Sequence, residues 1–515
     1  MGILNRIKLF LKSNWLIVLI FVLSTIYFMY LHHIHVSWDF ISYVLNAKYF
    51  AGQGAYFEML RPPLVPFSIF LLSFLKWKLT EYAFIFLASL LFVYSITRLA
   101  KKLSINKALF YSVLLSPFVL NYGLINGSEL LSVSLIALSI TYLVENNILS
   151  GLFLGLSSLA RYTGIFYFPL LFLNKKRKKI IMSFLLFILI IGSWFVYNYF
   201  TTGNIFSSIA NQYALNYIFR QELIQPANIL HFGIVFNYYI FFVLIGLFIS
   251  LKKLILEIKP IKKSFFAEVW NYINKFKVDI IFLILFIHGL YTYFSLPIKN
   301  ERFMFVMVLA IGYYTIIAIK FIVKKIKKYY KQINLKKLYI WIALGFILLN
   351  LAISLIVVTI GENHKATQYI EASKDIKDLG FSNCSLMSNS WVILNYYGQE
   401  SIPYPSEKVF QKKIDDGEKI IIFHNIGEPK YVKTGFLDNF SSLLKKDSYT
   451  IFGNTDVCLE KHDLDTTYLE ERKKNIFEIY NYYPNVDPCY ILFQHKPFLE
   501  KFCNFVNFKG FISSN

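Results

Sequence analysis

The sequence predicts a polytopic α-helical membrane protein with about 11 membrane helices, two of them forming a broken hairpin, and a small C-terminal α/β domain. Two observations predict this class. First, 56% of the 515 residues are hydrophobic and the mean hydropathy is +0.50, whereas soluble domains are roughly 45–50% apolar. Second, the apolar residues form blocks of about 20 residues with almost no charge, the length that a helix needs to cross a bilayer.

Uninterrupted apolar segments give the candidate spans. The first is not a cleaved signal peptide, because no small-x-small cleavage site follows it and further spans continue along the chain. A tight turn at Asn126-Gly127 separates the third span from the fourth. The predicted spans lie near residues 15–33, 81–99, 108–125, 128–144, 180–200, 231–251, 278–296, 303–320 and 338–359.

The net charge of +22 is unevenly distributed. Residues 360–515 hold 18 basic and 21 acidic side chains, so residues 1–359 hold the remaining 35 of 53 basic and 10 of 31 acidic ones. The excess lies between the spans, which indicates the positive-inside bias of membrane proteins and contact with anionic lipids rather than nucleic-acid binding. Arg6, Lys8 and Lys12 precede the first span, so we predict a cytoplasmic N-terminus, a transmembrane domain at 1–361 and an extracytoplasmic α/β domain at 362–515.

Residues 148–173 begin and end on the basic side, which a single crossing does not allow. We interpret the segment as a hairpin that turns near Arg161-Tyr162-Thr163-Gly164, because non-helical backbone at membrane depth is tolerated where it lines a cavity. A charged side chain at membrane depth is costly unless it lines such a cavity, so Arg161 is a functional candidate. The alternative is that Arg161 stabilises the break in the helix.

The C-terminal part alternates helix-like segments (366–379, 407–414) with strand-like ones (384–387, 419–423, 449–452), which predicts a small α/β domain. All four cysteines lie there: Cys384, Cys458, Cys489 and Cys503. An even number on the oxidising side predicts one or two disulfides, with three possible pairings and buried free thiols as the alternative. The N-x-S/T sequons lie only in predicted outer segments, at Asn126, Asn383 and Asn439.

The first outer loop, residues 34–79, contains the most promising chemistry. Asp39 begins an amphipathic stretch directly after the first span, so it is expected at the membrane interface. Glu58 and Arg61 follow, and the pair Pro62-Pro63 forces a break before the next apolar segment. The loop therefore places two carboxylates and a guanidinium group close to one membrane surface.

These elements resemble the GT-C superfamily of membrane glycosyltransferases, which use sugars carried on polyprenyl phosphates. The likeness is to the branch that contains bacterial aminoarabinose transferase and the protein O-mannosyltransferases. In that branch an acid after the first span is followed by a Tyr and an Ala, an aromatic-rich stretch and a basic-Pro-Pro-Leu element. This chain offers Asp39, Tyr43, Ala47, Tyr56-Phe57-Glu58 and Arg61-Pro62-Pro63-Leu64.

The chain departs from the pattern in two ways. It has a single acid where the branch has Asp-Glu, which leaves a requirement for a divalent metal ion open. Its basic residue stands two positions late, which leaves open which cation meets the phosphate. Three later segments also resemble the superfamily, so the likeness covers about residues 10–360: 151–169 around the broken hairpin, 198–206 in an outer loop, and Lys299-Asn300-Glu301-Arg302-Phe303.

The resemblance implies transfer of one sugar from a polyprenyl-phosphate donor. The chemistry needs a carboxylate to take the acceptor's proton and cations to hold the departing phosphate. A single displacement with one base inverts the anomeric carbon. We predict Asp39 as the base and Arg61, Arg161 and Arg302 as the phosphate-binding cations. Further site candidates are Glu58, Tyr43, Glu129, Glu301 and Arg220.

Structural interpretations compete with these roles. Asp39 can belong to a helix cap after Ser37, and Arg61 can extend its head group to the interface. Glu129 stands at a span start, where a cap is favoured over a ligand. Glu301 and Arg302 can be ordinary helix-end charges. A metal site at His32, His33 and His35 is not favoured, because no helix or strand register groups the three.

The sequence thus predicts a glycosyltransferase of cell-envelope glycosylation. Its donor is a dolichyl- or undecaprenyl-type phosphate sugar, and its acceptor is an extracytoplasmic glycan, lipid or protein. The alternative is a transporter or flippase of lipid-linked glycans, which should show related halves or charges along a pathway. A membrane-anchored scaffold is a third interpretation, which leaves the first outer loop and Arg161 unexplained.

Overall fold

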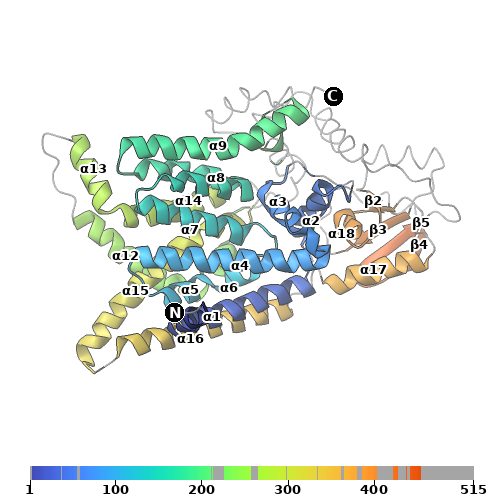
Figure 1. Cartoon of the computed structure of the whole chain (residues 1–515). Coiled ribbons are helices and arrows are strands. Elements are labelled where there is room, and N and C mark those ends of the chain that lie inside the picture. The colour runs from blue at the N-terminus through green and yellow to red at the C-terminus, as the bar shows by residue number, and fades with distance from the viewer. Residues whose placement is uncertain are drawn as a thin grey trace.

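In the computed structural model, a bundle of long helices carries a small β-sheet at one end, beside two short helices of the first loop (Figure 1). The described residues are 3–35, 37–54, 58, 60–203, 205–209, 212, 226–256, 265–296, 299–332, 334–360, 365–379, 386–402, 421–426, 437 and 441–453. Several predictions lie outside these residues: Arg220, the four cysteines, the sequons at Asn383 and Asn439, and the helix at 407–414.

Seven helical segments in the described part of the chain are long and apolar enough to cross a membrane. They are α1 (Ile3–Ile34), α4 (Trp77–Lys102), α9 (Arg177–Thr202), α11 with α12 (Ile229–Phe236, Ile240–Leu256), α14 (Lys277–Ser295), η5 with α15 (Glu301–Met307, Val308–Tyr329) and α16 (Leu335–Ile360). Helix α13 (Phe265–Lys275) precedes α14. The polytopic helical membrane class is confirmed. The other predicted spans, at 108–125, 128–144 and the hairpin at 148–173, are formed by shorter helices.

The predicted span at 108–125 is not one unbroken helix. The chain instead forms α5 (Lys107–Leu114) and α6 (Pro117–Tyr122). Pro117 has no backbone N–H and takes the first position of α6, which proline favours, and the Ser116 hydroxyl accepts a hydrogen bond from Val119 N. A proline at this point therefore starts a new helix instead of continuing the old one.

The segment 148–173 turns as the sequence predicted. Helix α8 (Leu149–Ala160) ends at Arg161, whose backbone is extended, and the 3₁₀ helix η2 (Tyr162–Leu173) follows. Gly164 packs so closely on α8 that a Cβ there would lie 2.9 Å from Ser158 N. Lys175 N donates to Asn146 Oδ1 at 3.0 Å, so the two ends of the hairpin meet.

Small and polar residues join the neighbouring helices. Helix α7 (Glu129–Val144) packs on α8 through Ser132 and Ser157, whose hydroxyls lie 2.9 Å apart. On the other side of α8, Asn174 donates to Ser183 of α9 at 3.1 Å. Such side chains let helices approach closely and supply interhelical hydrogen bonds where apolar burial does not distinguish helix from lipid.

Helix α2 (Trp38–Phe50) follows α1, and α3 (Leu64–Phe70) and the 3₁₀ turn η1 (Ser73–Leu75) lead to α4. Pro63 caps α3, where the predicted break occurs. Residues 40–47 of α2 are all buried, so this helix is covered on more than one side. It is the element that positions the site.

The C-terminal region contains α17 (Ala366–Asp378), α18 (Trp391–Tyr396) and five strands. The strands are β1 (Leu386–Ser388), β2 (Ser401–Ile402), β3 (Ile421–Asn425), β4 (Ser441–Lys445) and β5 (Tyr449–Gly453), in the order β2-β1-β3-β5-β4. Strand β1 is parallel to β2 and β3, and β5 is antiparallel to β3 and β4. Helix α17 packs on this sheet. The predicted helix at 366–379 and the three predicted strands agree with these elements to within two residues.

Candidate active site

Asp39 lies in the first turn of α2, where the helix dipole stabilises a negative charge. Arg61 Nη1 donates to Asp39 Oδ1 at 2.5 Å, and Arg302 Nη1 lies 2.8 Å from Asp39 Oδ2. Arg61 also donates from Nε to Glu58 Oε2 at 2.7 Å. The first loop and the start of η5 therefore meet at Asp39, although they are far apart in sequence.

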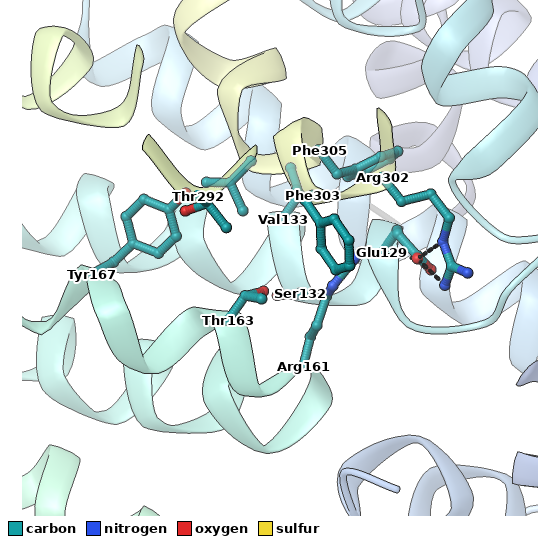
Figure 2. A pocket seen from close by; sticks show the side chains of 11 residues that line it. Glu129, Ser132, Val133, Arg161, Thr163, Tyr167, Thr292, Arg302, Phe303 and Phe305 are labelled. Atoms are coloured by element: carbon teal, nitrogen blue, oxygen red, sulfur yellow. Dashed lines mark hydrogen bonds and ion pairs between the residues drawn. The ribbon is translucent and has the colours of Figure 1, made fainter. Parts of the chain in front are cut away.

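Glu129 forms the second half of the site. It stands fully buried at the start of α7. Arg302 donates to Glu129 Oε1 from Nη2 at 2.5 Å and from Nε at 2.8 Å (Figure 2). Arg161 Nη1 lies 2.8 Å from the same oxygen, in an ion pair whose geometry does not align a hydrogen bond. One oxygen of Glu129 thus contacts two guanidinium groups.

The six charged groups form one alternating chain: Glu58, Arg61, Asp39, Arg302, Glu129 and Arg161. Three carboxylates balance three guanidinium groups, so the charges sum to zero. Their order divides the chain into an acid-rich half at Glu58, Arg61 and Asp39 and a cation-rich half at Arg302, Glu129 and Arg161. We call these the acid half and the cation half.

Helix α2 also supports the neighbours of Asp39. Asn46 donates from Nδ2 to Glu58 O at 3.0 Å and accepts from Glu58 N at 2.8 Å, which fixes the backbone of the acid. Arg61 lies over the Tyr43 ring, 5.8 Å from its centroid, and donates to Ser42 Oγ at 3.4 Å. Ser42 and Asn46 were not among the residues predicted for the site. Their spacing from Asp39, one and two helical turns, was the available signal.

The electrostatic balance at Asp39 favours the ionised form. Burial raises the pKa of this carboxyl, but the charges of Arg61 and Arg302 and their hydrogen bonds outweigh burial and hold the pKa well below its usual range. The side chain keeps 23% of its surface exposed. Asp39 is therefore an ionised acceptor that remains accessible.

A small pocket adjoins the cation half (Figure 2). Arg161, Glu129 and Arg302 line one end, and Tyr167 and Thr292 lie toward the other. Ser132 and Thr163 contribute hydroxyls, and Phe303 and Phe305 contribute apolar surface. The pocket combines positive charge with hydroxyl groups and aromatic rings, a lining that favours an anionic, hydrogen-bonding group over an apolar one.

The structure decides several of the competing interpretations. The sequence favoured a helix cap for Glu129, but its carboxylate instead forms ion pairs with Arg302 and Arg161. Arg61 is 7% exposed and contacts two carboxylates, so it does not extend to the interface. Glu301 pairs with a residue outside the charged chain, since its Oε2 lies 3.5 Å from His231 Nε2.

The three histidines at and just after the end of α1, which are His32, His33 and His35, do not converge on one point. His32 lies 2.8 Å from Glu81 Oε2, and His33 lies 3.3 Å from the hydroxyl of Tyr82. Within the described residues, no group of three or more His, Cys, Asp or Glu side chains is placed to hold a metal ion. The carboxylates of the site contact arginines instead.

The arrangement defines a polytopic helical membrane protein with a charged site at the end of the bundle that carries the C-terminal sheet (Figure 1). The fold matches solved structures of ArnT. The crystal structure of ArnT from Cupriavidus metallidurans bound to undecaprenyl phosphate aligns with a TM-score of 0.55 and 11% identity, covering 88% of this chain and all (100%) of that one.

The same protein in its apo state aligns with a TM-score of 0.54 and 12% identity, covering 86% of this chain and 98% of that one. No protein-family model matches the chain, and no curated protein matches its sequence. At this level of identity the likeness establishes the fold over most of the chain. The chemistry has to be argued from the site.

Proposed function

We propose that the protein is a glycosyltransferase that moves one sugar from a polyprenyl-phosphate donor to an extracytoplasmic acceptor, with inversion at the anomeric carbon. The observation that carries the proposal is the division of the charged chain into an acid half and a cation half. The ArnT-like fold supports it, since that enzyme's structure holds undecaprenyl phosphate.

Asp39 acts as the general base. The oxygen of an acceptor hydroxyl forms a bond to the anomeric carbon while the bond from that carbon to the phosphate oxygen breaks. The hydroxyl proton passes to the Asp39 carboxylate, and the leaving group departs as polyprenyl phosphate. Because no covalent sugar–enzyme bond forms, the configuration inverts. The acid half supplies this base in ionised form.

Arg161 and Arg302 receive the donor phosphate. The phosphodiester carries one negative charge and gains a second as it leaves, so cations beside it stabilise the transition state more than the ground state. Arg161 is the more available of the two, because its contact with Glu129 is not an aligned hydrogen bond. Arg302 contacts Asp39 as well, so a phosphate that draws Arg302 away also frees one oxygen of the base.

Arg61 has a different part. Its ion pairs with Asp39 and Glu58 both lie in the acid half. We therefore propose that Arg61 orients the Asp39 carboxylate. Tyr43 supports its guanidinium group. The first-loop cation is thus proposed to hold the base, and the two distant arginines to hold the phosphate.

The predicted orientation belongs to this proposal. The basic loops face the cytoplasm, and the charged site, the first loop and the domain at 362–515 face outward. The lipid tail of the donor then lies in the membrane while its sugar meets the acceptor at the outer surface. Either a dolichyl- or an undecaprenyl-type carrier fits this arrangement.

The test measures sugar release from radiolabelled polyprenyl-phosphate sugars by the purified protein. Wild type and Asp39→Asn are compared, with Asp279→Asn as the matched control. Asp279 is a buried acid paired with Lys253 at 2.8 Å in another part of the bundle. We expect release by wild type and by the folded control, and loss of release in Asp39→Asn.

Two results would count against the proposal. Equal release by wild type and Asp39→Asn removes Asp39 from the mechanism. No release from any donor, together with movement of lipid-linked glycan across vesicles that contain the protein, favours the transporter interpretation.

A further inference from the structure

Glu81 is a buried carboxylate outside the charged chain of the site. It lies in α4 and is 1% exposed. The Tyr396 hydroxyl of α18 donates to it, 2.8 Å from Oε1 and 2.9 Å from Oε2. His32 Nε2 of α1 lies 2.8 Å from Oε2. A carboxylate buried to this extent is costly unless it is partnered, so its partners on α1 and α18 hold three parts of the chain together.

This cluster continues to the helix that carries Asp39. The His32 ring packs against Phe40, with ring centroids 4.5 Å apart. Phe40 follows Asp39 directly in α2. A contiguous set of contacts therefore runs from Tyr396 in the C-terminal region, through Glu81 and His32, to the residue next to the proposed base.

Helix α2 has a second connection to the C-terminal region. Phe40, Tyr43, Val44 and Ala47 face the membrane bundle, with the spacing of one helical face. Ile41 and Leu45 instead pack with α17 and α18 residues. The Trp38 ring meets Trp391 edge-on, with centroids 6.0 Å apart. The helix is thus held between the bundle and the C-terminal region.

From these contacts we infer that Tyr396 and Glu81 are positioning residues for sugar transfer: they lock α18 onto the bundle and thereby fix α2 and Asp39. The inference rests on the proposed function for its catalytic part. Neither residue contacts the charged chain. They act by keeping Asp39 within reach of Arg61 and Arg302 and of the acceptor hydroxyl.

The state of Tyr396 agrees with this role. Burial, and after it the charge of Glu81 and the hydrogen bond to it, raise the pKa of Tyr396 well above its usual value. The phenol therefore stays protonated and remains a donor over the whole physiological range. Loss of the hydroxyl leaves a buried carboxylate with one partner fewer, which loosens the contact.

Tyr396→Phe removes only the hydroxyl and keeps the ring. Tyr397→Phe is the matched control: it makes the same change at the next position, where the hydroxyl is not hydrogen-bonded to Glu81. Three quantities are measured for the full chain: kcat of sugar transfer, Kd for polyprenyl phosphate, and hydrogen exchange of the α2 amides.

We expect kcat of Tyr396→Phe to fall by about tenfold or more, because small displacements of a catalytic group are costly. Its Kd for polyprenyl phosphate should stay within about twofold, because the cation half does not touch this contact. Exchange of the α2 amides should rise while that of α7 does not. Tyr397→Phe should match wild type in all three. In a double-mutant cycle, Glu81→Leu, which offers no acceptor to the hydroxyl, should abolish the effect of Tyr396→Phe.

The melting temperature is measured alongside these quantities as a check on stability. The inference is overturned if Tyr396→Phe behaves like Tyr397→Phe, or if kcat and the melting temperature fall while Kd rises, as in a general loss of stability. Hydrogen exchange needs no activity. If wild type transfers no sugar, the proposed function fails, but the exchange measurement still tests the contact. Raised exchange of the α2 amides in Tyr396→Phe shows that the contact holds this helix, and unchanged exchange shows that it does not.

Discussion

Among the six residues of the charged chain, Arg302 is the one whose ion pairs join the two halves of the site, so Arg302→Met is the sharpest perturbation. The substitution keeps the length of the side chain and removes its charge. It leaves Asp39 with Arg61 and Glu129 with Arg161, so three carboxylates face two guanidinium groups. The site changes from neutral to a net charge of about −1, which opposes the binding of an anionic phosphate.

The magnitude follows from the hydrogen bonds that the Arg302 guanidinium group can offer to a phosphate. A hydrogen bond to a charged group contributes about 1.5–3 kcal/mol. If the phosphate takes over one such bond from Arg302, its removal raises the Kd for polyprenyl phosphate by about 10- to 150-fold. Arg302→Lys keeps the charge but lacks the planar fork that bridges two carboxylates, so its Kd should fall between those of wild type and Arg302→Met.

The assay is direct binding of polyprenyl phosphate to purified protein that elutes as a single folded species. Arg98→Met is the control, since Arg98 pairs with Glu145 at 3.9 Å, away from the charged chain. We expect the control to bind like wild type. Binding by Arg302→Met within about twofold of the control refutes the assignment of the cation half to the phosphate.

Three further predictions concern the acid that competes for the cations, the pH profile and the helix packing. Glu129→Gln removes the carboxylate that competes for its two arginines, so polyprenyl phosphate should bind at least as tightly as in wild type; weaker binding contradicts the competition. Because the pKa of Asp39 is held low, kcat/KM should stay flat as the pH falls from 8 to about 5. Arg61→Met leaves Arg302 as the one cation of the charged chain that opposes the effect of burial on Asp39, so the pKa of Asp39 should rise and activity of this variant should decline with falling pH in the same window; parallel profiles contradict it. Gly151→Ala places a Cβ 1.7 Å from a backbone oxygen of α9, which should lower the thermal unfolding temperature in detergent by an overpacking cost of about 1–3 kcal/mol. Gly192→Ala, with no atom within 4 Å, is its control.

Several parts of the fold could be predicted because their signals are local. Apolar length and charge distribution along the chain determine that the protein crosses a membrane, since the bilayer selects each span separately. The hairpin at Arg161 was predicted because the preceding spans leave residue 148 on the basic side, where the basic run at 175–179 also ends the segment. In contrast, Pro117 was included in a continuous span because its apolar neighbours dominate the hydropathy.

The candidate residues of the site could also be selected from the sequence, because acids are scarce before residue 360. Asp39, Arg61, Arg161 and Arg302 all lie in the charged chain that the structure forms. Their roles could not be assigned in the same way. Glu129 resembled a helix cap, since its position at the start of a helix is local and its contact with Arg302, 173 residues away, is not.

The sequence by itself determined that this is a membrane protein with a charged first loop and a short set of candidate residues. Only the tertiary structure decided which carboxylate faces which arginine, where the acid half ends, and that Tyr396 reaches Glu81 across 315 residues. The physical reason is that hydropathy and turn signals act within a few residues. An ion pair depends on how helices from distant parts of the chain pack, and any of several arginines could have met a given acid.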